Sequence, residues 1–340
     1  MNTSTYQILQ EIGSPFINSN INRSEIDFEK LYLYSKKNKM PILYLRSIIE
    51  SGYQKEDYKD YIVLKETWVE IEKRIKLIIK ILDSNNIKYT TFKSIKPYNE
   101  VTVDIDLLIF NNYTMALDEL KEAGYKMLLK GPLSSTFRDP NFKIDYDIYD
   151  EVGVSNIIYF DKEKSTKYIF KKSLQTGGYI DSLTPSLDLL AVIAHSVIKE
   201  QMYTLAEYYT TLYYLSSMKR EEMDTFIEMA NVLKLKNAVR AHIGLTCCIH
   251  RMAYGVIPPP IHEIVSKFGI DGFEAERAKQ SGYNTPHKFH PLTLMKCFSE
   301  KIQESKARRS FALQAQSMMS PNFMRSFLPK FLSHVTRITY

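Results

Sequence analysis

Closely spaced aspartates in apolar segments are the residues of this chain best suited to chemistry. Asp104 and Asp106 flank one isoleucine in DIDLLIF, and Asp145 and Asp147 alternate with apolar residues in KIDYDIYD. Residues two apart in a β-strand point to the same face of the sheet. Two carboxylates on one buried face repel each other, and a bridging divalent cation compensates for that repulsion. Mg²⁺ in particular binds carboxylates together with the phosphates of a substrate.

These aspartates predict a metal centre that serves phosphoryl or nucleotidyl transfer. We expect Asp104 and Asp106 to hold Mg²⁺ or Mn²⁺, and Asp145 to complete the centre as the third catalytic carboxylate. Asp147 is an additional candidate ligand on the same predicted strand as Asp145. The alternative is that the Asp-x-Asp pattern marks the solvent side of a half-exposed sheet.

The segments around the aspartates predict the elements that position them. Apolar residues at helical spacing predict a helix over 66–83. Short apolar runs then predict strands at 87–92, 101–110, 125–129 and 142–149. A helix in NNYTMALDELKEAG, with an asparagine as N-cap and Gly124 at its end, separates the second strand from the third. From Thr184-Pro185 the chain is helix-rich to about residue 335.

The pattern predicts an α+β protein with three regions. A small mixed-sheet core at 85–180 follows an N-terminal helical segment at 1–84 and precedes a helical domain with a basic tail at 181–340. The 340 residues are 44% hydrophobic and 25% charged, which excludes wholesale disorder and fibrous repeats. The sequence has no apolar run long enough for a spanning helix and no signal peptide, so we expect a cytoplasmic protein.

A family resemblance adds to this interpretation. Ser94, followed after nine intervening residues by Asp-Ile-Asp-Leu, resembles the signature of the polymerase-β-like nucleotidyltransferase superfamily, where a Gly-Ser or Gly-Gly turn precedes an Asp-x-Asp strand. A poorly characterised prokaryotic nucleotidyltransferase family is more similar still, over about residues 66–215. The segments that carry this similarity are IKYTTFKS, DIDLLIF, ALDELKEAGYK, KIDYDIY and LTPSLDLLAVIAHSVIK.

The resemblance implies a transferase that binds ATP or another nucleoside triphosphate with Mg²⁺. It makes Asp104, Asp106 and Asp145 the metal ligands, and it assigns Lys93 and Ser94 to the phosphates of the nucleotide. Lys93 and Ser94 both stand where related turns carry glycine, and an arginine often found before the Asp-x-Asp strand is absent. These departures favour an alternative function, a catalytically inactive module that binds nucleotide or RNA.

The positive charge of the C-terminal end indicates which class of molecule accepts the transferred group. Residues 301–340 carry seven basic residues and one acidic residue, which accounts for the whole net charge of +6. This concentration favours RNA or tRNA as acceptor, with Lys306, Arg308 and Arg309 as candidate contacts. A small molecule, a protein hydroxyl and a toxin-like modification of tRNA are alternatives. The apolar face of 321–335 predicts docking on the helical domain, with partner, nucleic-acid or membrane-surface binding as alternatives.

We expect the histidines and cysteines named below to pack in the cores of helices. His195 lies in the apolar run LLAVIAHSVI, where a single histidine is typical of a helix core. Four further residues lie close together on one predicted helix, and their spacing favours core packing over a zinc site: His242, Cys247, Cys248 and His250.

Overall fold

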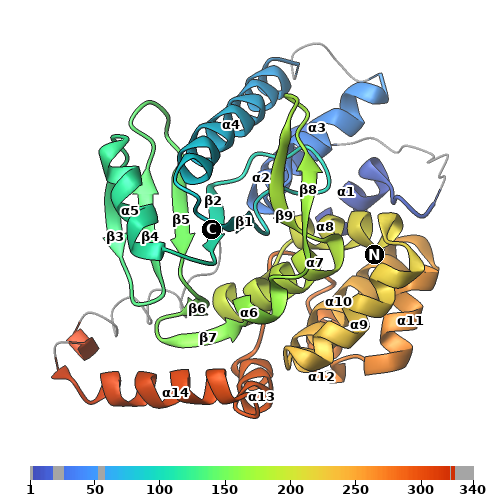
Figure 1. The fold of residues 1–340 in the computed structure, drawn as a ribbon. Coiled ribbons are helices and arrows are strands. Elements are labelled where there is room, and N and C mark those ends of the chain that lie inside the picture. Colours follow the sequence, from blue (N-terminus) through green and yellow to red (C-terminus); the bar gives the residue numbers. More distant parts are fainter. Residues whose placement is uncertain (1–2, 18–26, 53–57, 322, 326–340) are drawn as a thin grey trace.

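The structure is a computed structural model, and it describes residues 3–17, 27–52, 58–321 and 323–325 (Figure 1). N-terminal helices come first along the chain, a seven-stranded mixed sheet follows, and a helical region ends the described part. The predicted α+β class is therefore confirmed, whereas the domain boundaries proposed from the sequence stay predictions. None of the helices in the described ranges is both long and apolar enough to cross a membrane.

Helices dominate the described residues on both sides of the sheet region. The helices of the N-terminal and sheet regions are α1 (Ser4–Ile12), α2 (Phe28–Lys37), α3 (Pro41–Glu50), α4 (Tyr58–Ser84), α5 (Tyr113–Glu122) and α6 (Lys162–Ser165). Those that follow the sheet are α7 (Pro185–Ala194), the π-helix η1 (His195–Glu200), α8 (Leu205–Ser217), α9 (Arg220–Val232), α10 (Lys236–Tyr254), α11 (Pro259–Phe268), α12 (Gly272–Gln280), α13 (Pro291–Lys301) and α14 (Ser305–Met318).

The main sheet has the strand order β3-β4-β5-β2-β1-β9-β8. Its strands are β1 (Tyr89–Thr91), β2 (Asp104–Ile109), β3 (Lys126–Lys130), β4 (Ser134–Arg138), β5 (Asp145–Tyr149), β8 (Ile169–Ser173) and β9 (Tyr179–Leu183). Two small pairs lie apart from it: β6 (Val152–Val154) with β7 (Ile157–Phe160), and β10 (Met202–Tyr203) with β11 (His287–Lys288). The β5–β2 and β1–β9 pairs are parallel and the other neighbours in the main sheet are antiparallel.

Successive side chains of β2 point to opposite faces of the sheet. One face is apolar and the other carries the aspartates. Ile105, Leu107 and Ile109 are fully buried against the apolar sides of α4 and α5. Asp104, Asp106 and Leu108 point the other way because successive strand residues face opposite sides. Leu108 packs in the larger core, which is formed mainly by the N-terminal and C-terminal helices. The aspartates therefore lie between the sheet and the helical region.

The helical region supplies the second wall of the site. Helix α7 begins at Pro185, is buried along nearly its whole length, and continues directly into η1. The histidines of α10 are buried as predicted: His242 contacts the Thr211 hydroxyl (2.9 Å) and His250 contacts the Ser14 hydroxyl (3.0 Å). These contacts fix α10 against its neighbours.

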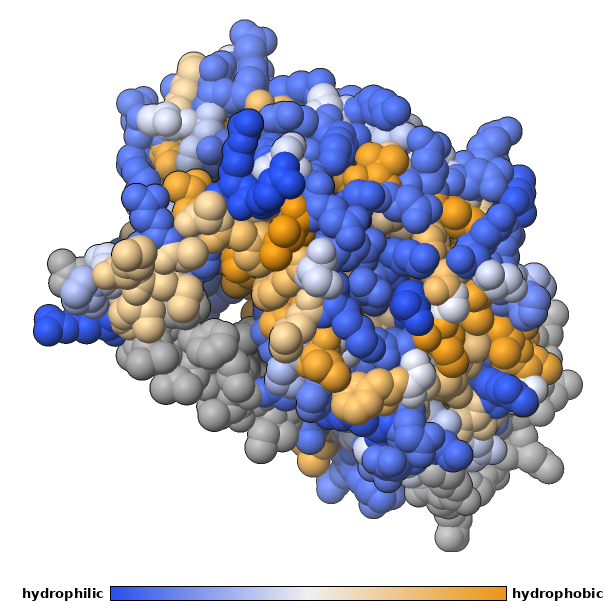
Figure 2. Space-filling model, turned by 90° about the horizontal axis from the view of Figure 1, so that it is seen from below, coloured by the Kyte–Doolittle hydropathy of each residue, from blue (hydrophilic) through white to orange (hydrophobic). Residues whose placement is uncertain are grey.

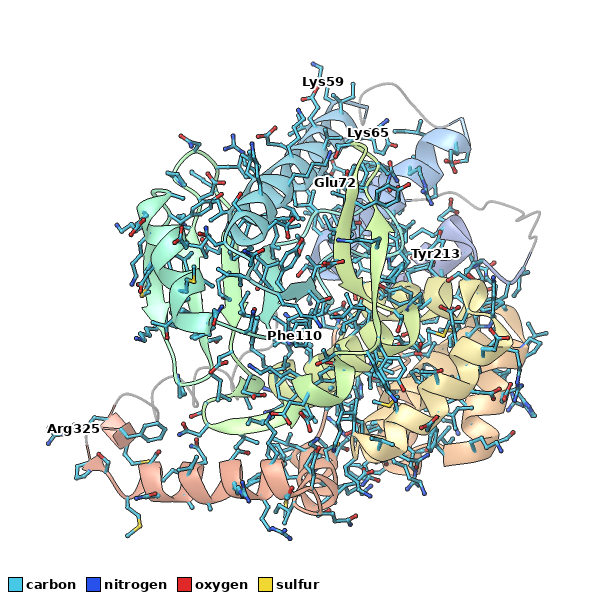
Figure 3. The ribbon with its side chains drawn as sticks, viewed as in Figure 1. Lys59, Lys65, Glu72, Phe110, Tyr213 and Arg325 are labelled. Atoms are coloured by element: carbon cyan, nitrogen blue, oxygen red, sulfur yellow. The ribbon has the colours of Figure 1, made fainter. Side chains whose placement is uncertain are left out.

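Two buried carboxylates tie the β-sheet to neighbouring helices. Glu72 of α4 accepts hydrogen bonds from the backbone N–H groups of Gln175 (3.3 Å) and Thr176 (2.8 Å), in the turn between β8 and β9 (Figure 3). Glu100, in the connection between β1 and β2, accepts from the backbone N–H groups of Ile42 and Leu43, at 3.3 Å each. Ile42 and Leu43 lie in the first turn of α3, where backbone N–H groups need an external acceptor. The connection that leads into β2 is thereby anchored to the N-terminal helices.

Burial of Glu100 predicts a specific dependence of stability on pH. Burial raises the pKa of Glu100 from 4.5 to about 7, although Lys96 and the α3 N–H groups act in the opposite direction. The folded state therefore holds a proton that the unfolded state releases, and stability falls as pH rises from about 4.5 to about 7. Glu100→Gln removes this titration. As pH rises across this window, the unfolding free energy of the wild type should fall relative to that of Glu100→Gln by up to about 3 kcal/mol.

Chemical denaturation of both proteins at several pH values measures this difference. Glu50→Gln, which removes an exposed carboxylate at the end of α3, is the control. A difference between Glu100→Gln and the wild type that stays constant with pH contradicts the assignment.

Candidate metal centre

The parallel register of β2 and β5 brings four aspartates onto one face of the sheet. Asp104 lies opposite Asp145, and Asp106 lies opposite Asp147. Carboxylate oxygens of Asp104, Asp106 and Asp147 all lie within 4.8 Å of one another. We call these three residues the aspartate triad. The triad offers only oxygen ligands, which is the donor set that Mg²⁺ and Mn²⁺ prefer, so its composition fits the metal predicted from the sequence.

Asp145 stands outside the triad because a neighbouring strand supplies it with a cation. Arg138 of β4 lies directly opposite Asp145 in the antiparallel β4–β5 pair. Its Nε and Nη2 donate to the two carboxylate oxygens at 2.7 and 2.9 Å, a bidentate ion pair. The sequence offered Asp145 as third ligand and Asp147 as an addition, whereas the structure groups Asp147 with Asp104 and Asp106. Arg138, on the strand next to β5, separates the two aspartates, and the sequence did not indicate that strand.

Neutral donors, in contrast, orient Asp147. Thr136 lies opposite Asp147 in the β4–β5 pair, and its hydroxyl donates to Oδ1 at 2.6 Å. The Tyr149 hydroxyl lies 3.4 Å from Oδ2. These contacts leave the charge of Asp147 uncompensated by any cation in direct contact among the described residues, and a carboxylate in that state is a strong ligand for a metal ion.

Ser94 holds Asp106 through two hydrogen bonds. Its hydroxyl donates to Asp106 Oδ2 at 2.7 Å and accepts from the Asp106 backbone N–H at 2.7 Å. Both groups are buried. Ser94 therefore orients a triad residue from the turn that precedes β2, in addition to the phosphate contact predicted for it.

Lys93 places a buried ammonium group on the triad. Its Nζ lies 2.5 Å from Asp106 Oδ1, and its side chain is 8% exposed. Burial alone would lower the pKa of Lys93, but Asp106 and Asp104 outweigh that effect and raise it. Burial also raises the pKa of Asp106, with Asp104 and Asp147 adding to the shift and Lys93 opposing it. The contact between Lys93 and Asp106 therefore offsets part of the cost of burying the Asp106 carboxylate.

A cavity of about 100 Å³ adjoins Asp104 and Asp106 between the sheet and the helices. Polar side chains from four segments line it, among them Lys39, Lys96, His195, Glu200 and Glu207. A space of this size accommodates several water molecules.

His195 lines this cavity, whereas the sequence predicted only a packing role for it. Its Nε2 lies 3.3 Å from Glu200 Oε1 and its Nδ1 lies 3.3 Å from the Tyr159 hydroxyl. Burial and the nearby Lys93 lower the pKa of His195 to about 3, so the ring is neutral. His195 and Glu200 are the first and last residues of η1. Short π-helical segments often occur at functional sites, but the sequence carries no clear signal for one.

The predicted basic contacts on α14 differ from one another. Lys306 is paired with three acids, Glu151 (2.7 Å), Glu163 (3.3 Å) and Asp161 (3.4 Å), and so fastens α14 to the sheet region. Arg308 and Arg309 are exposed.

The surface seen from below has hydrophilic side chains over most of its area and hydrophobic ones in separate patches (Figure 2). Residues 326–335 of the predicted amphipathic face lie outside the described residues, and Arg325 is an exposed residue near the end of the described chain (Figure 3).

Comparisons with known proteins add no family assignment. A scan against models of protein families finds no match to this chain, and a search of curated proteins finds no significant match.

The geometry predicts different effects for two neighbouring aspartates. Asp147→Asn removes a charged ligand of the triad and should weaken Mn²⁺ binding at least about tenfold. Asp145→Asn is the matched control, because it changes a residue of the same strand and face that is already paired with Arg138. Its Mn²⁺ affinity should stay within about twofold of the wild type. Titration calorimetry measures both, and equal losses in the two variants would contradict the assignment of Asp147.

Proposed function

We propose that this protein is a Mg²⁺-dependent nucleotidyltransferase that moves a nucleoside monophosphate from a triphosphate to an acceptor hydroxyl. The observation that carries the proposal is the aspartate triad on β2 and β5, with Lys93 and Ser94 in the turn beside it. The resemblance of the Asp-x-Asp strand and its preceding turn to nucleotidyltransferases supports the same conclusion.

The side chains have distinct roles in this reaction. Asp104, Asp106 and Asp147 would hold Mg²⁺, which supplies positive charge to the triphosphate and favours ionisation of the acceptor hydroxyl. Ser94 keeps the Asp106 carboxylate in a fixed orientation. Lys93 supplies an ammonium for the phosphates, where charge develops during transfer.

The overall reaction follows from this arrangement. The acceptor oxygen attacks the α-phosphorus, the bond from that phosphorus to the bridging oxygen breaks, and pyrophosphate leaves as the acceptor proton passes to solvent. Fixed positions of ligands and donors reduce the cost of bringing the reactants together.

RNA is the acceptor class that we propose first. The exposed guanidinium groups of Arg308 and Arg309 suit contacts with a phosphate backbone. Lys306 is less suited to that role because three carboxylates compensate its charge.

A second candidate function rests on the contact between Lys93 and Asp106. An ammonium 2.5 Å from Asp106 Oδ1 occupies a ligand atom of the triad, which suits a module that binds nucleotide without chemistry. Metal-dependent transfer separates this candidate from the enzyme.

A labelling experiment tests the enzymatic function. Purified protein is incubated with each of four α-labelled nucleoside triphosphates, Mg²⁺ or Mn²⁺, and total cellular RNA. The wild type should transfer label, and Asp106→Asn should lower the rate at least about a hundredfold because the triad loses a charged ligand. Asp145→Asn is the matched control and should retain most of the activity. Gel separation and thin-layer chromatography identify labelled RNA, protein or small product.

Absence of transfer with every nucleotide and acceptor would contradict the enzymatic proposal and favour the binding module. Equal transfer by the wild type and by Asp106→Asn would contradict the role of the triad.

The RNA proposal predicts a salt-dependent effect of the exposed arginines. Arg308→Ala/Arg309→Ala should weaken RNA binding and reduce its salt slope by about 0.7 for each phosphate contact that is lost. Lys306→Ala should instead lower the melting temperature, because it leaves three acidic residues without their shared cation. Fluorescence anisotropy with labelled tRNA at several salt concentrations measures the slopes. Unchanged affinity in the arginine variant would exclude α14 from the RNA-binding surface.

A further inference from the structure

Lys93 occupies a backbone conformation that lysine rarely adopts. Its φ of +51° lies in the left-handed region, which glycine enters without a steric penalty. Two buried contacts keep it there. The Lys93 backbone N–H donates to Asp188 Oδ1 at 2.5 Å, and the Tyr214 hydroxyl donates to the other oxygen of Asp188. Strained backbone positions cluster at functional sites, so the surroundings of the Lys93 side chain are relevant.

The Lys93 side chain ends on the aspartate triad. Its Nζ lies 2.5 Å from Asp106 Oδ1, 5.6 Å from the centre of the Phe92 ring and 5.9 Å from that of the Tyr149 ring. The ammonium therefore lies between two aromatic rings and a carboxylate, with little contact with solvent. It supplies the positive charge that a buried carboxylate needs when no metal is bound.

Both oxygens of Asp106 have partners in this arrangement. Oδ2 accepts from the Ser94 hydroxyl at 2.7 Å, and Oδ1 faces Lys93. A divalent ion that binds through Oδ1 must approach to about 2.1 Å, and it would repel the ammonium on the same atom. The repulsion between the two cations therefore disfavours their joint binding at Oδ1.

We propose that Lys93 is an internal competitor of the divalent ion: it neutralises Asp106 in the metal-free protein and leaves Asp106 when the metal binds. This inference rests on the proposed function for the second half of its cycle, in which the displaced ammonium binds the phosphate chain of the nucleoside triphosphate. Phosphate draws Lys93 away from Asp106, so triphosphate and metal each favour binding of the other. Such coupling is reciprocal between the two ligands.

The competition predicts opposite effects of one substitution on two ligands. Lys93→Met removes the ammonium and should strengthen Mn²⁺ binding about tenfold. The same variant should weaken binding of magnesium tripolyphosphate, a probe that carries the phosphate chain without a base, about tenfold. If Lys93 had only a structural role, Lys93→Met would weaken the binding of both Mn²⁺ and magnesium tripolyphosphate. Lys93→Arg retains a charge on the same segment and should resemble the wild type in its Mn²⁺ affinity.

Two further variants keep the test decisive. Lys93→Gly also removes the ammonium and relieves the left-handed strain, so it provides a folded alternative if Lys93→Met is unstable. Lys96→Met is the matched control, because Lys96 is a second, partly buried lysine of the same turn that lines the same cavity, with its Nζ 3.3 Å from the Lys39 carbonyl. Its Mn²⁺ affinity should change less than about threefold.

Electron paramagnetic resonance of free Mn²⁺ measures the metal affinity, and calorimetry measures the tripolyphosphate affinity. Mn²⁺ binding by Lys93→Met and Lys93→Gly that equals or falls below that of the wild type would overturn the proposal. An equal gain in Lys96→Met would also overturn it, because general loss of positive charge would then explain the result. Neither readout requires catalysis. A gain in Mn²⁺ affinity in Lys93→Met, together with no transfer of label by the wild type, would support the competition and contradict the enzymatic function. Transfer of label by the wild type without a gain in Mn²⁺ affinity in Lys93→Met would support the enzymatic function and contradict the competition.

Discussion

The parallel pairing of β2 with β5 is the constraint on which the rest of the site depends. It aligns two Asp-x-Asp segments on one face of the sheet, so that four carboxylates lie side by side. Burial of like charges is unfavourable unless cations or hydrogen-bond donors compensate them. Several neighbouring side chains compensate these carboxylates with positive charge or hydrogen bonds.

The compensation is unequal, and this inequality assigns the roles. Arg138 neutralises Asp145 with a bidentate pair, and Lys93 compensates Asp106. Asp147 receives neutral hydrogen bonds from Thr136 and Tyr149. Among the described residues, Lys93 is the cation that forms an ion pair with the triad, so a divalent ion would add positive charge where three carboxylates lie close together.

The helical region completes the site from the other side. Asp188 of α7 holds the backbone of Lys93, and η1 supplies His195 and Glu200 to the cavity wall. The N-terminal helices contribute through Glu100, which fastens the connection between β1 and β2 to α3. Segments far apart in the sequence therefore determine where the Lys93–Ser94 turn lies relative to the triad.

Periodicity predicted the elements that carry strong local signals. The predicted strand at 101–110 contains β2, the predicted helix at 66–83 lies within α4, and Gly124 ends α5 with a φ of +88°. Strand β4, with the sequence SSTFR, was not predicted because it has few apolar residues. That omission hid Arg138 and Thr136, and with them the distinction between Asp145 and Asp147. The contact between Lys93 and Asp106 was equally invisible, since it depends on tertiary structure.

Anomalous diffraction from crystals grown with Mn²⁺ shows which carboxylates bind the metal ion. We expect an anomalous peak within ligand distance of carboxylate oxygens of Asp104, Asp106 and Asp147, with the Lys93 ammonium moved away from Asp106 Oδ1. A triad without a peak at saturating Mn²⁺, or a peak ligated by Asp145 in place of Asp147, would contradict the assignment of the triad as the metal site.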